Sequence, residues 1–170
     1  VKYAKSIGLD TMVLHVATNE GLEQGKTREL CDFLKAEGID TWLLYPSAIG
    51  KWAGKHELLL NDENHRRYKE LLNEPHISWE GDANYYKDGC PAGTEVAYIS
   101  PYGDICPCPF IHLSFGNLFK EKLKDGIGRM RKEEPFGSIH SHCLVGVDRE
   151  FYKEYIDIHA GKQFPVDMTT

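Results

Sequence analysis

The chain has 170 residues, with 20 Lys and Arg side chains against 26 Asp and Glu side chains, which gives a formal net charge of −6 at pH 7. No block of basic residues exceeds an ordinary solvated helix face, and this argues against a nucleic-acid or anionic-membrane partner, because phosphate binding needs a basic face. Apolar residues make up 41% of the chain, without a bilayer-length apolar run or a signal peptide, so we expect a folded cytoplasmic protein.

The first 72 residues predict alternating helices and strands. The chain opens on a helical pattern, VKYAKSIG, with no capping residue before it, and we interpret it as a fragment of a longer protein. The expected elements are the end of a helix over 1–8, a strand buried on both faces over 11–17, a loop over 19–26, a helix over 27–38, a second buried strand over 39–45, a long loop, and a helix over 62–72 capped by Asn61.

Strand and helix alternate at a spacing that indicates parallel strands joined by crossovers. Two parallel strands are not a stable sheet alone, because such sheets need cover and neighbours on both sides. We therefore expect additional chain at the amino-terminal edge of this α/β part.

From residue 76 the sequence predicts a small α+β part built from a β-hairpin and helices. A half-exposed strand is expected over 93–100, a turn over 101–104 and a returning strand in DICPCPF. Further on we expect a helix over 118–133 capped by Asn117, a short helix over 148–157 capped by Asp148, and a tail. The predicted divisions are 1–75, 76–160 and 161–170. The Tyr85–Tyr86 pair and the three Trp residues are expected to pack rather than bind a cofactor.

Five cysteines form an uneven set. Cys31 stands alone on an amphipathic helix and is expected only to pack. The other four fall in the second half of the chain, and in a reducing cytosol such a set indicates a metal site more than disulfides. They are Cys90, Cys106, Cys108 and Cys143.

The predicted hairpin is suited to holding such ligands. Thiolates favour soft metals and iron–sulfur clusters. A hairpin can present them rigidly, and Gly103 allows its turn to close tightly. Pro107 and Pro109 beside the ligands stiffen the strand. The competing interpretation is a non-enzymatic structural or interaction module that binds zinc through these cysteines or a histidine, although zinc sites more often use Cys-x2-Cys pairs.

The run GCPAGTEVAYISPYGDICPCPF, followed by FGNLFKEKLKDG, resembles the SPASM/twitch auxiliary domain of radical SAM enzymes. Cys90, Gly103 and Cys108 fall on the family's Cys–Gly–Cys pattern, and Gly116-Asn117-Leu118 falls on its Gly-Asn element. With one downstream cysteine, Cys143, the arrangement is similar to the shorter twitch form with a single cluster.

The resemblance implies an iron–sulfur cluster, 4Fe–4S in preference to 2Fe–2S, held by Cys90, Cys108 and Cys143. It leaves the fourth position open between Cys106, His140, His142 and an iron free to take substrate.

The strand–helix part is similar to the later βα units of the partial, TIM-like radical SAM barrel, and its PSAIGKWAG loop is similar to a loop of some members. This likeness implies S-adenosylmethionine contacts near Asn19 and Pro46, which follow the two strands. His15 would line the barrel interior, although a core histidine is the commoner case.

The family's SAM-cleaving loop, Cys-x3-Cys-x2-Cys, is absent from the sequence. The resemblance therefore implies the carboxyl-terminal portion of a radical SAM oxidoreductase or maturase that does not cleave SAM by itself. Its auxiliary cluster would bind substrate or relay an electron. The implied partners are a peptide, protein or small-molecule substrate and an electron-donor protein such as ferredoxin or flavodoxin.

Overall fold

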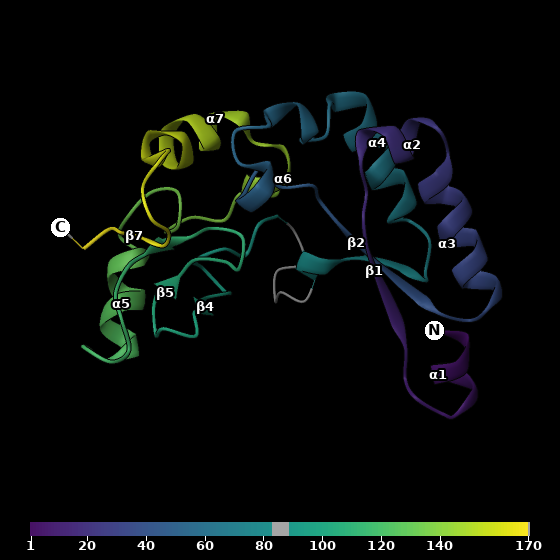
Figure 1. Ribbon diagram of the computed structural model, residues 1–170, viewed down its shortest axis with the longest axis horizontal. Helices are drawn as coiled ribbons and strands as arrows, with labels where there is room; N and C mark the ends of the chain where they lie inside the picture. Colours follow the sequence, from purple (N-terminus) through teal and green to yellow (C-terminus); the bar gives the residue numbers. More distant parts are fainter. Residues whose placement is uncertain (83–88, 170) are drawn as a thin grey trace. The chain divides into compact units, whose positions relative to one another are not determined.

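The computed structural model describes residues 1–82 and 89–169. The chain divides into two compact units, Val1–Asp82 and Ala83–Thr170 (Figure 1). The Tyr85–Tyr86 pair lies outside the described residues, so its predicted packing stays a prediction.

The first unit is built on a three-stranded sheet. Its strands are β1 (Met12–Val16), β2 (Asp40–Leu44) and β3 (Ile77–Trp79), in the order β1-β2-β3. Both neighbouring pairs are parallel, with Met12 opposite Asp40 and Thr41 opposite Ile77. This confirms the two predicted strands and their parallel pairing. The third strand was not predicted, and it carries the first unit beyond the predicted division at residue 75.

Helices accompany this sheet in the first unit. They are α1 (Lys2–Ser6), α2 (Asn19–Glu23), α3 (Lys26–Ala36) and α4 (Asp62–Leu71), with 3-10 turns η1 (Gly50–Trp52), η2 (His56–Leu58) and η3 (Glu80–Asp82). The predicted cap of α4 is confirmed, because the Asn61 side chain accepts a hydrogen bond of 2.8 Å from the Asn64 amide. Helix α2 occupies the predicted loop over 19–26, and Thr18 caps it by accepting from the Gly21 amide.

One expectation for this sheet is wrong. The strand over 11–17 was predicted to be buried on both faces, yet Met12 is 48% exposed and Leu14 is 54% exposed. Strand β1 lies at the edge of the described sheet, whereas β2 lies between two neighbours and buries Thr41 and Leu43 completely. The described residues form no closed barrel, so the partial TIM-like barrel stays a prediction.

The second unit contains the predicted hairpin. Strands β4 (Tyr98–Ile99) and β5 (Ile105–Cys106) pair in antiparallel fashion, which confirms the hairpin with shorter strands than predicted. A further strand, β6 (Leu113–Ser114), pairs in parallel with β7 (Val166–Asp167). The predicted tail therefore contributes a strand to the unit.

The helices of the second unit are shorter than the sequence suggested. They are α5 (Leu123–Met130), α6 (Leu144–Val147) and α7 (Arg149–Phe151), continued by a π-helical turn η4 (Tyr152–Ile156) and a 3-10 turn η5 (Asp157–His159). Asp148 caps α7 as predicted, accepting from the Phe151 amide at 2.9 Å. Asn117 does not cap α5, which begins at Leu123. A side chain at Gly126 would meet Ile105, so this glycine allows α5 to pack closely on β5.

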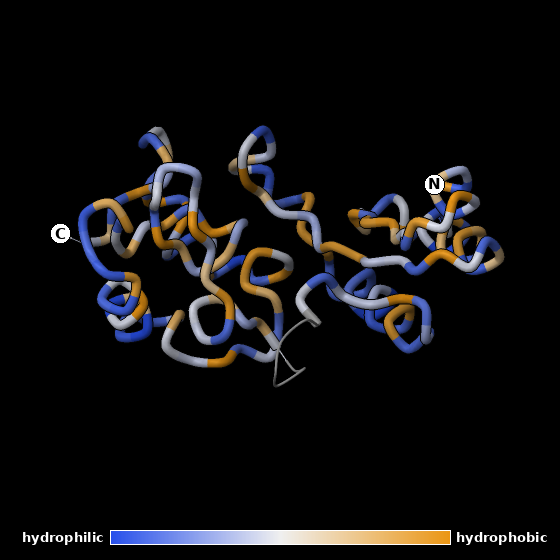
Figure 2. Tube along the Cα trace, turned by 90° about the horizontal axis from the view of Figure 1, so that it is seen from below, coloured by the Kyte–Doolittle hydropathy of each residue, from blue (hydrophilic) through white to orange (hydrophobic). Residues whose placement is uncertain are grey.

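No helix in the described part of the chain has the length and apolarity needed to cross a membrane. Figure 2 shows why, since short hydrophobic stretches alternate with hydrophilic ones along the trace.

Candidate metal centre

Cys90 is fixed by a backbone pairing with the segment before Cys143. Its amide donates to the His140 carbonyl at 2.7 Å, and the two residues form an isolated antiparallel bridge. Gly89 makes this close approach possible. Its φ is +81°, and a Cβ at this position would lie 1.8 Å from the His140 carbonyl oxygen. The Gly-Cys dipeptide thus brings Cys90 to the chain segment that carries Cys143.

Cys143 meets Cys90 at the start of helix α6. Cys143 donates a hydrogen bond to the Cys90 sulfur, and the backbone amides of Leu144 and Ala92 also donate to that sulfur. The hydrogen bond from Cys143, helped by these amides against the opposing effect of burial, lowers the pKa of Cys90 to about 6. The pKa of Cys143 is correspondingly raised, first by this shared hydrogen bond and then by burial.

Cys108 is the third thiol of this group. It lies just beyond β5, where the chain turns back so that the Ile111 amide donates to the Cys108 carbonyl at 3.1 Å. The pKa of Cys143 is raised mainly by Cys90 and by burial, and the negative charge of Cys108 adds a smaller effect in the same direction. Cys143 therefore interacts with thiols of two other segments, through a hydrogen bond with Cys90 and through the charge of Cys108. We refer to Cys90, Cys108 and Cys143 as the thiol group.

Cys106, the fourth predicted thiol ligand, has a different environment from the thiol group. It is 1% exposed, and burial together with the nearby Asp104 carboxylate raises the pKa of its thiol to about 12. Residues two apart share one face only while a strand stays regular. Strand β5 ends at Cys106 and the chain bends at Pro107, so Cys106 and Cys108 follow different paths.

The two nearby histidines differ in what they can offer. His140 lies near Cys90, to which its backbone is paired, and its Nε2 atom donates to the Pro135 carbonyl at 2.6 Å, so Nδ1 is the ring atom that remains to bind a metal. Both ring nitrogens of His142 are engaged, Nε2 with the Asp148 carboxylate at 3.1 Å and Nδ1 with the Ser141 hydroxyl at 3.3 Å. His140 is therefore the more available ligand of the two.

Within residues 1–82 and 89–169, no group of three or more His, Cys, Asp and Glu side chains is close enough together to hold a metal ion. The thiol group nevertheless has the donor chemistry of an iron–sulfur site, because it offers three soft sulfur ligands with backbone N–H groups directed at one sulfur. The ligand atoms of these residues are of the type that an iron–sulfur cluster binds. Binding would replace the proton that Cys90 and Cys143 share.

A side-chain clamp that the sequence did not reveal holds the hairpin. The Asn117 amide nitrogen donates to the Tyr102 carbonyl at 2.8 Å and to the Asp104 carboxylate at 3.0 Å. Its side-chain oxygen accepts from the Phe119 amide at 2.9 Å. Asn117 thus fastens the turn of the hairpin instead of capping a helix. The Gly116-Asn117 pair was the one sequence feature that could have indicated this clamp.

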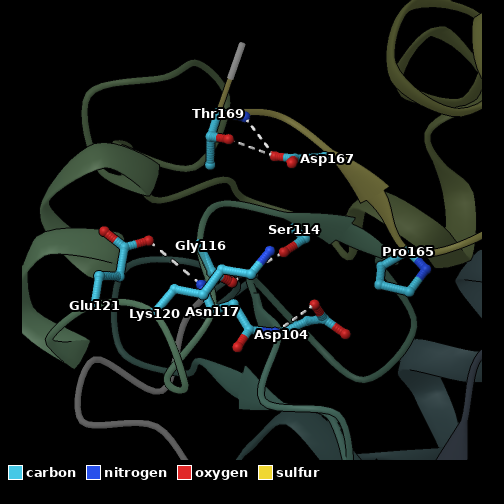
Figure 3. A pocket seen from close by; sticks show the side chains of 9 residues that line it. All are labelled: Asp104, Ser114, Gly116, Asn117, Lys120, Glu121, Pro165, Asp167 and Thr169. Carbon is cyan, nitrogen blue, oxygen red and sulfur yellow. Dashed lines mark hydrogen bonds between the residues drawn. The ribbon is translucent and has the colours of Figure 1, made fainter.

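A polar cavity of about 140 Å³ opens beside this clamp (Figure 3). Its three carboxylates are already engaged: Asp104 with Asn117, Glu121 with Arg129, and Asp167 with Thr169. Figure 3 shows the Lys120 side chain extending across the opening. The cavity is therefore stabilised by hydrogen bonds within the chain and is separate in character from the thiol group.

The residues predicted to lie near SAM have structural roles in the first unit. Asn19 uses its amide nitrogen for the carbonyls of Glu57 and Leu59, and its oxygen accepts from the Asn61 amide and the Asn64 side chain. Pro46 is buried. His15 contacts the Thr27 hydroxyl at 3.3 Å, and burial lowers the pKa of its imidazole.

Comparison with known proteins addresses the second unit. Residues 90–143 match the family model of the SPASM iron–sulfur cluster-binding domain. The match begins at Cys90 and ends at Cys143, two members of the thiol group. No curated protein and no solved structure matches the chain. Over residues 90–143 the chain is therefore similar to an iron–sulfur cluster-binding domain of the SPASM kind.

Proposed function

We propose that the thiol group holds an auxiliary iron–sulfur cluster, of the 4Fe–4S type, that serves radical SAM chemistry. The observation that carries the proposal is the match of residues 90–143 to the SPASM cluster-binding domain, within which Cys143 is hydrogen-bonded to Cys90 and lies near the charge of Cys108. When bound, such a cluster supplies a one-electron redox centre or an iron that accepts a substrate atom.

The chain's own contribution is to hold and tune the sulfur ligands. The backbone amides of Ala92 and Leu144 donate to the Cys90 sulfur and so favour its thiolate form. Cys90 is 5% exposed, which limits the access of water to this side of the site. Hydrogen bonds to sulfur and burial are two of the factors that set the potential of a cluster.

The fourth ligand comes from four alternatives. Cys106, the predicted candidate nearest in sequence, is buried beside the Asp104 carboxylate, and its thiol has a raised pKa that disfavours the thiolate a cluster needs. His140 is closer, since its backbone pairs with Cys90. His142 and an iron left open for substrate complete the alternatives.

In this proposal a polypeptide segment other than these 170 residues holds the SAM-cleaving cluster, because they contain no Cys-x3-Cys-x2-Cys sequence. The auxiliary cluster would bind a peptide, protein or small-molecule substrate, or pass on its electron. A low-potential electron-donor protein would supply reducing equivalents. SAM contacts near Asn19 and Pro46 belong to this proposal only through backbone atoms, since the Asn19 side chain is fully hydrogen-bonded within the chain.

Anaerobic purification followed by iron, sulfide and zinc analysis tests the proposal. We expect a brown protein with iron and sulfide, and we expect Cys108→Ala to lose them because the remaining ligands bind poorly. Cys31→Ala is the matched control, since Cys31 is fully buried in the first unit, and it should retain the iron content of the parent protein. Cys106→Ala then reports whether this residue is the fourth ligand.

A colourless protein containing zinc would contradict the proposal and favour the zinc-binding module. Unchanged iron in Cys108→Ala would contradict the ligand assignment even if the protein is brown.

A further inference from the structure

A tight turn over residues 91–96 follows Cys90 directly. The carbonyl of its first residue closes the turn by accepting hydrogen bonds of 3.0–3.2 Å from three amides within it. The Gly93 amide also donates to the Pro107 carbonyl at 3.1 Å, one residue before Cys108. The turn therefore links the segment of one sulfur ligand to the segment of another.

Arg131 binds this turn from the end of helix α5. Its Nε atom donates to the Gly93 carbonyl at 3.3 Å, and its Nη2 atom donates to the Thr94 carbonyl. The guanidinium group suits two neighbouring acceptors, because its donors are fixed in a planar fork. The turn also packs closely on Phe136, since a Cβ at Gly93 would lie 2.7 Å from the Phe136 carbonyl oxygen. Contacts with these two residues therefore fix the position of the turn.

The same turn carries a hydrogen-bond donor to the thiol group. The Ala92 amide lies inside the turn and donates to the Cys90 sulfur. A hydrogen bond to a ligand sulfur stabilises the reduced, more negative state of an iron–sulfur cluster more than the oxidised state, so it raises the reduction potential. Gly93, the residue after Ala92, is bound by Arg131. The direction of this amide therefore depends on the contact between Arg131 and the turn.

We propose that Arg131 is a positioning residue for the auxiliary cluster, and that it raises the reduction potential by holding the Ala92 amide toward the Cys90 sulfur. The inference rests on the proposed function, because it concerns the cluster placed there. Arg131 acts through two backbone carbonyls and is not itself a ligand. The step it affects is the one-electron reduction of the cluster, in which an external reductant is oxidised and no bond or proton changes place. A purely structural role would alter the free energy of unfolding and leave the potential unchanged.

The test compares two variants that each remove one positive charge from neighbouring exposed positions. Arg131→Met removes both hydrogen bonds to the turn. Lys132→Met is the matched control, because the Lys132 side chain forms no hydrogen bond or ion pair within the described part of the chain. The anaerobically purified chain with its cluster is titrated with dithionite in the presence of redox mediators. Electron paramagnetic resonance follows the reduced cluster and gives the midpoint potential.

We expect Arg131→Met to lower the equilibrium constant for cluster reduction by about fivefold or more, a shift of about 40 mV to more negative potential for a one-electron couple. Lys132→Met should change this constant by less than about twofold, because an exposed charge acts only through a screened field. Arg131→Lys should lie between the parent and Arg131→Met, since an ammonium group keeps the charge but does not reproduce the fork that binds two carbonyls.

The other outcomes separate this inference from the proposed function. An unchanged potential in iron-replete Arg131→Met refutes the positioning role and leaves the cluster assignment intact. Equal shifts in Arg131→Met and Lys132→Met show a general charge effect and also refute it. If Arg131→Met loses its cluster, Arg131→Lys replaces it in the titration, and a midpoint equal to that of the parent then refutes the role. A parent protein without iron and sulfide refutes the proposed function, and with it this inference.

Discussion

Replacing Gly89 by Ala provides a sharp test of how the thiol group is assembled. The added Cβ would lie 1.8 Å from the His140 carbonyl oxygen, whereas real Cβ atoms essentially never approach another heavy atom within 3.0 Å. The obstacle is backbone, so no side-chain rotation relieves it. The two segments must separate by about 1 Å, which stretches the 2.7 Å hydrogen bond from the Cys90 amide beyond useful length.

The magnitude follows from two contributions. A non-glycine residue at a φ of +81° costs about 1–2 kcal/mol. Losing the hydrogen bond and leaving its buried groups unpaired costs about 1–3 kcal/mol more. We therefore expect Gly89→Ala to reduce the free energy of unfolding by about 2–5 kcal/mol, a large fraction of the ~5–15 kcal/mol typical of a folded domain. Because Cys90 moves away from Cys143, iron retention should fall as well.

The assay is urea unfolding of the metal-free chain, followed by circular dichroism, together with iron analysis of the anaerobically purified protein. Gly128→Ala is the control, because a Cβ there meets nothing within 4 Å and the residue lies inside α5. It should be neutral or stabilise by about 0.5–1 kcal/mol. If Gly89→Ala unfolds at the parent's urea concentration and keeps its iron, the assembly described for the thiol group is wrong.

Three further predictions concern single side chains. Asn117→Ala removes the clamp on the hairpin turn, so urea unfolding should show a loss of about 1–3 kcal/mol; an unchanged midpoint would deny the clamp a structural role. The pKa of the Cys106 thiol is about 12 in the folded protein, whereas that of an unfolded cysteine is about 8.5. Between these two values only the unfolded state loses the proton, so stability should fall as the pH rises above about 8.5. Cys106→Ala should flatten that decline in pH-dependent unfolding of the metal-free chain, and an identical slope would count against the buried thiol. Asn19→Ala should lower the melting temperature, because the side chain joins α2 to the loop before α4. An unchanged melting temperature would contradict this structural role.

Local sequence signals predicted the elements whose formation depends on neighbouring residues. The apolar runs at 11–17 and 39–45 became β1 and β2, and Asn61 caps α4 through its own first turn. The turn at 101–104 closes the hairpin as expected. These signals act over a few residues, so a reader of the sequence can find them without knowing the fold.

Elements that depend on distant partners were missed or misplaced. Strand β3 has only three residues and forms because β2 offers it an edge, and β7 forms because β6 does. Asparagine is a common helix cap, but the side-chain nitrogen of Asn117 bonds partners 13 and 15 residues earlier in the chain, across the hairpin. Local capping preference therefore gave way to hydrogen bonds that exist only in the tertiary structure.

The sequence by itself determined which residues have the chemistry of a metal site, because thiol spacing and the Gly-Asn element are local patterns. Only the tertiary structure shows that Cys143 is hydrogen-bonded to Cys90, whereas Cys106 is buried beside Asp104. The end of β5 and the bend at Pro107 separate the environments of Cys106 and Cys108, although the two are near neighbours in the chain. Backbone pairing through Gly89 joins Cys90 to the segment of Cys143 across some fifty residues. Convergence of this kind depends on packing and chain path, which spacing along a sequence does not specify.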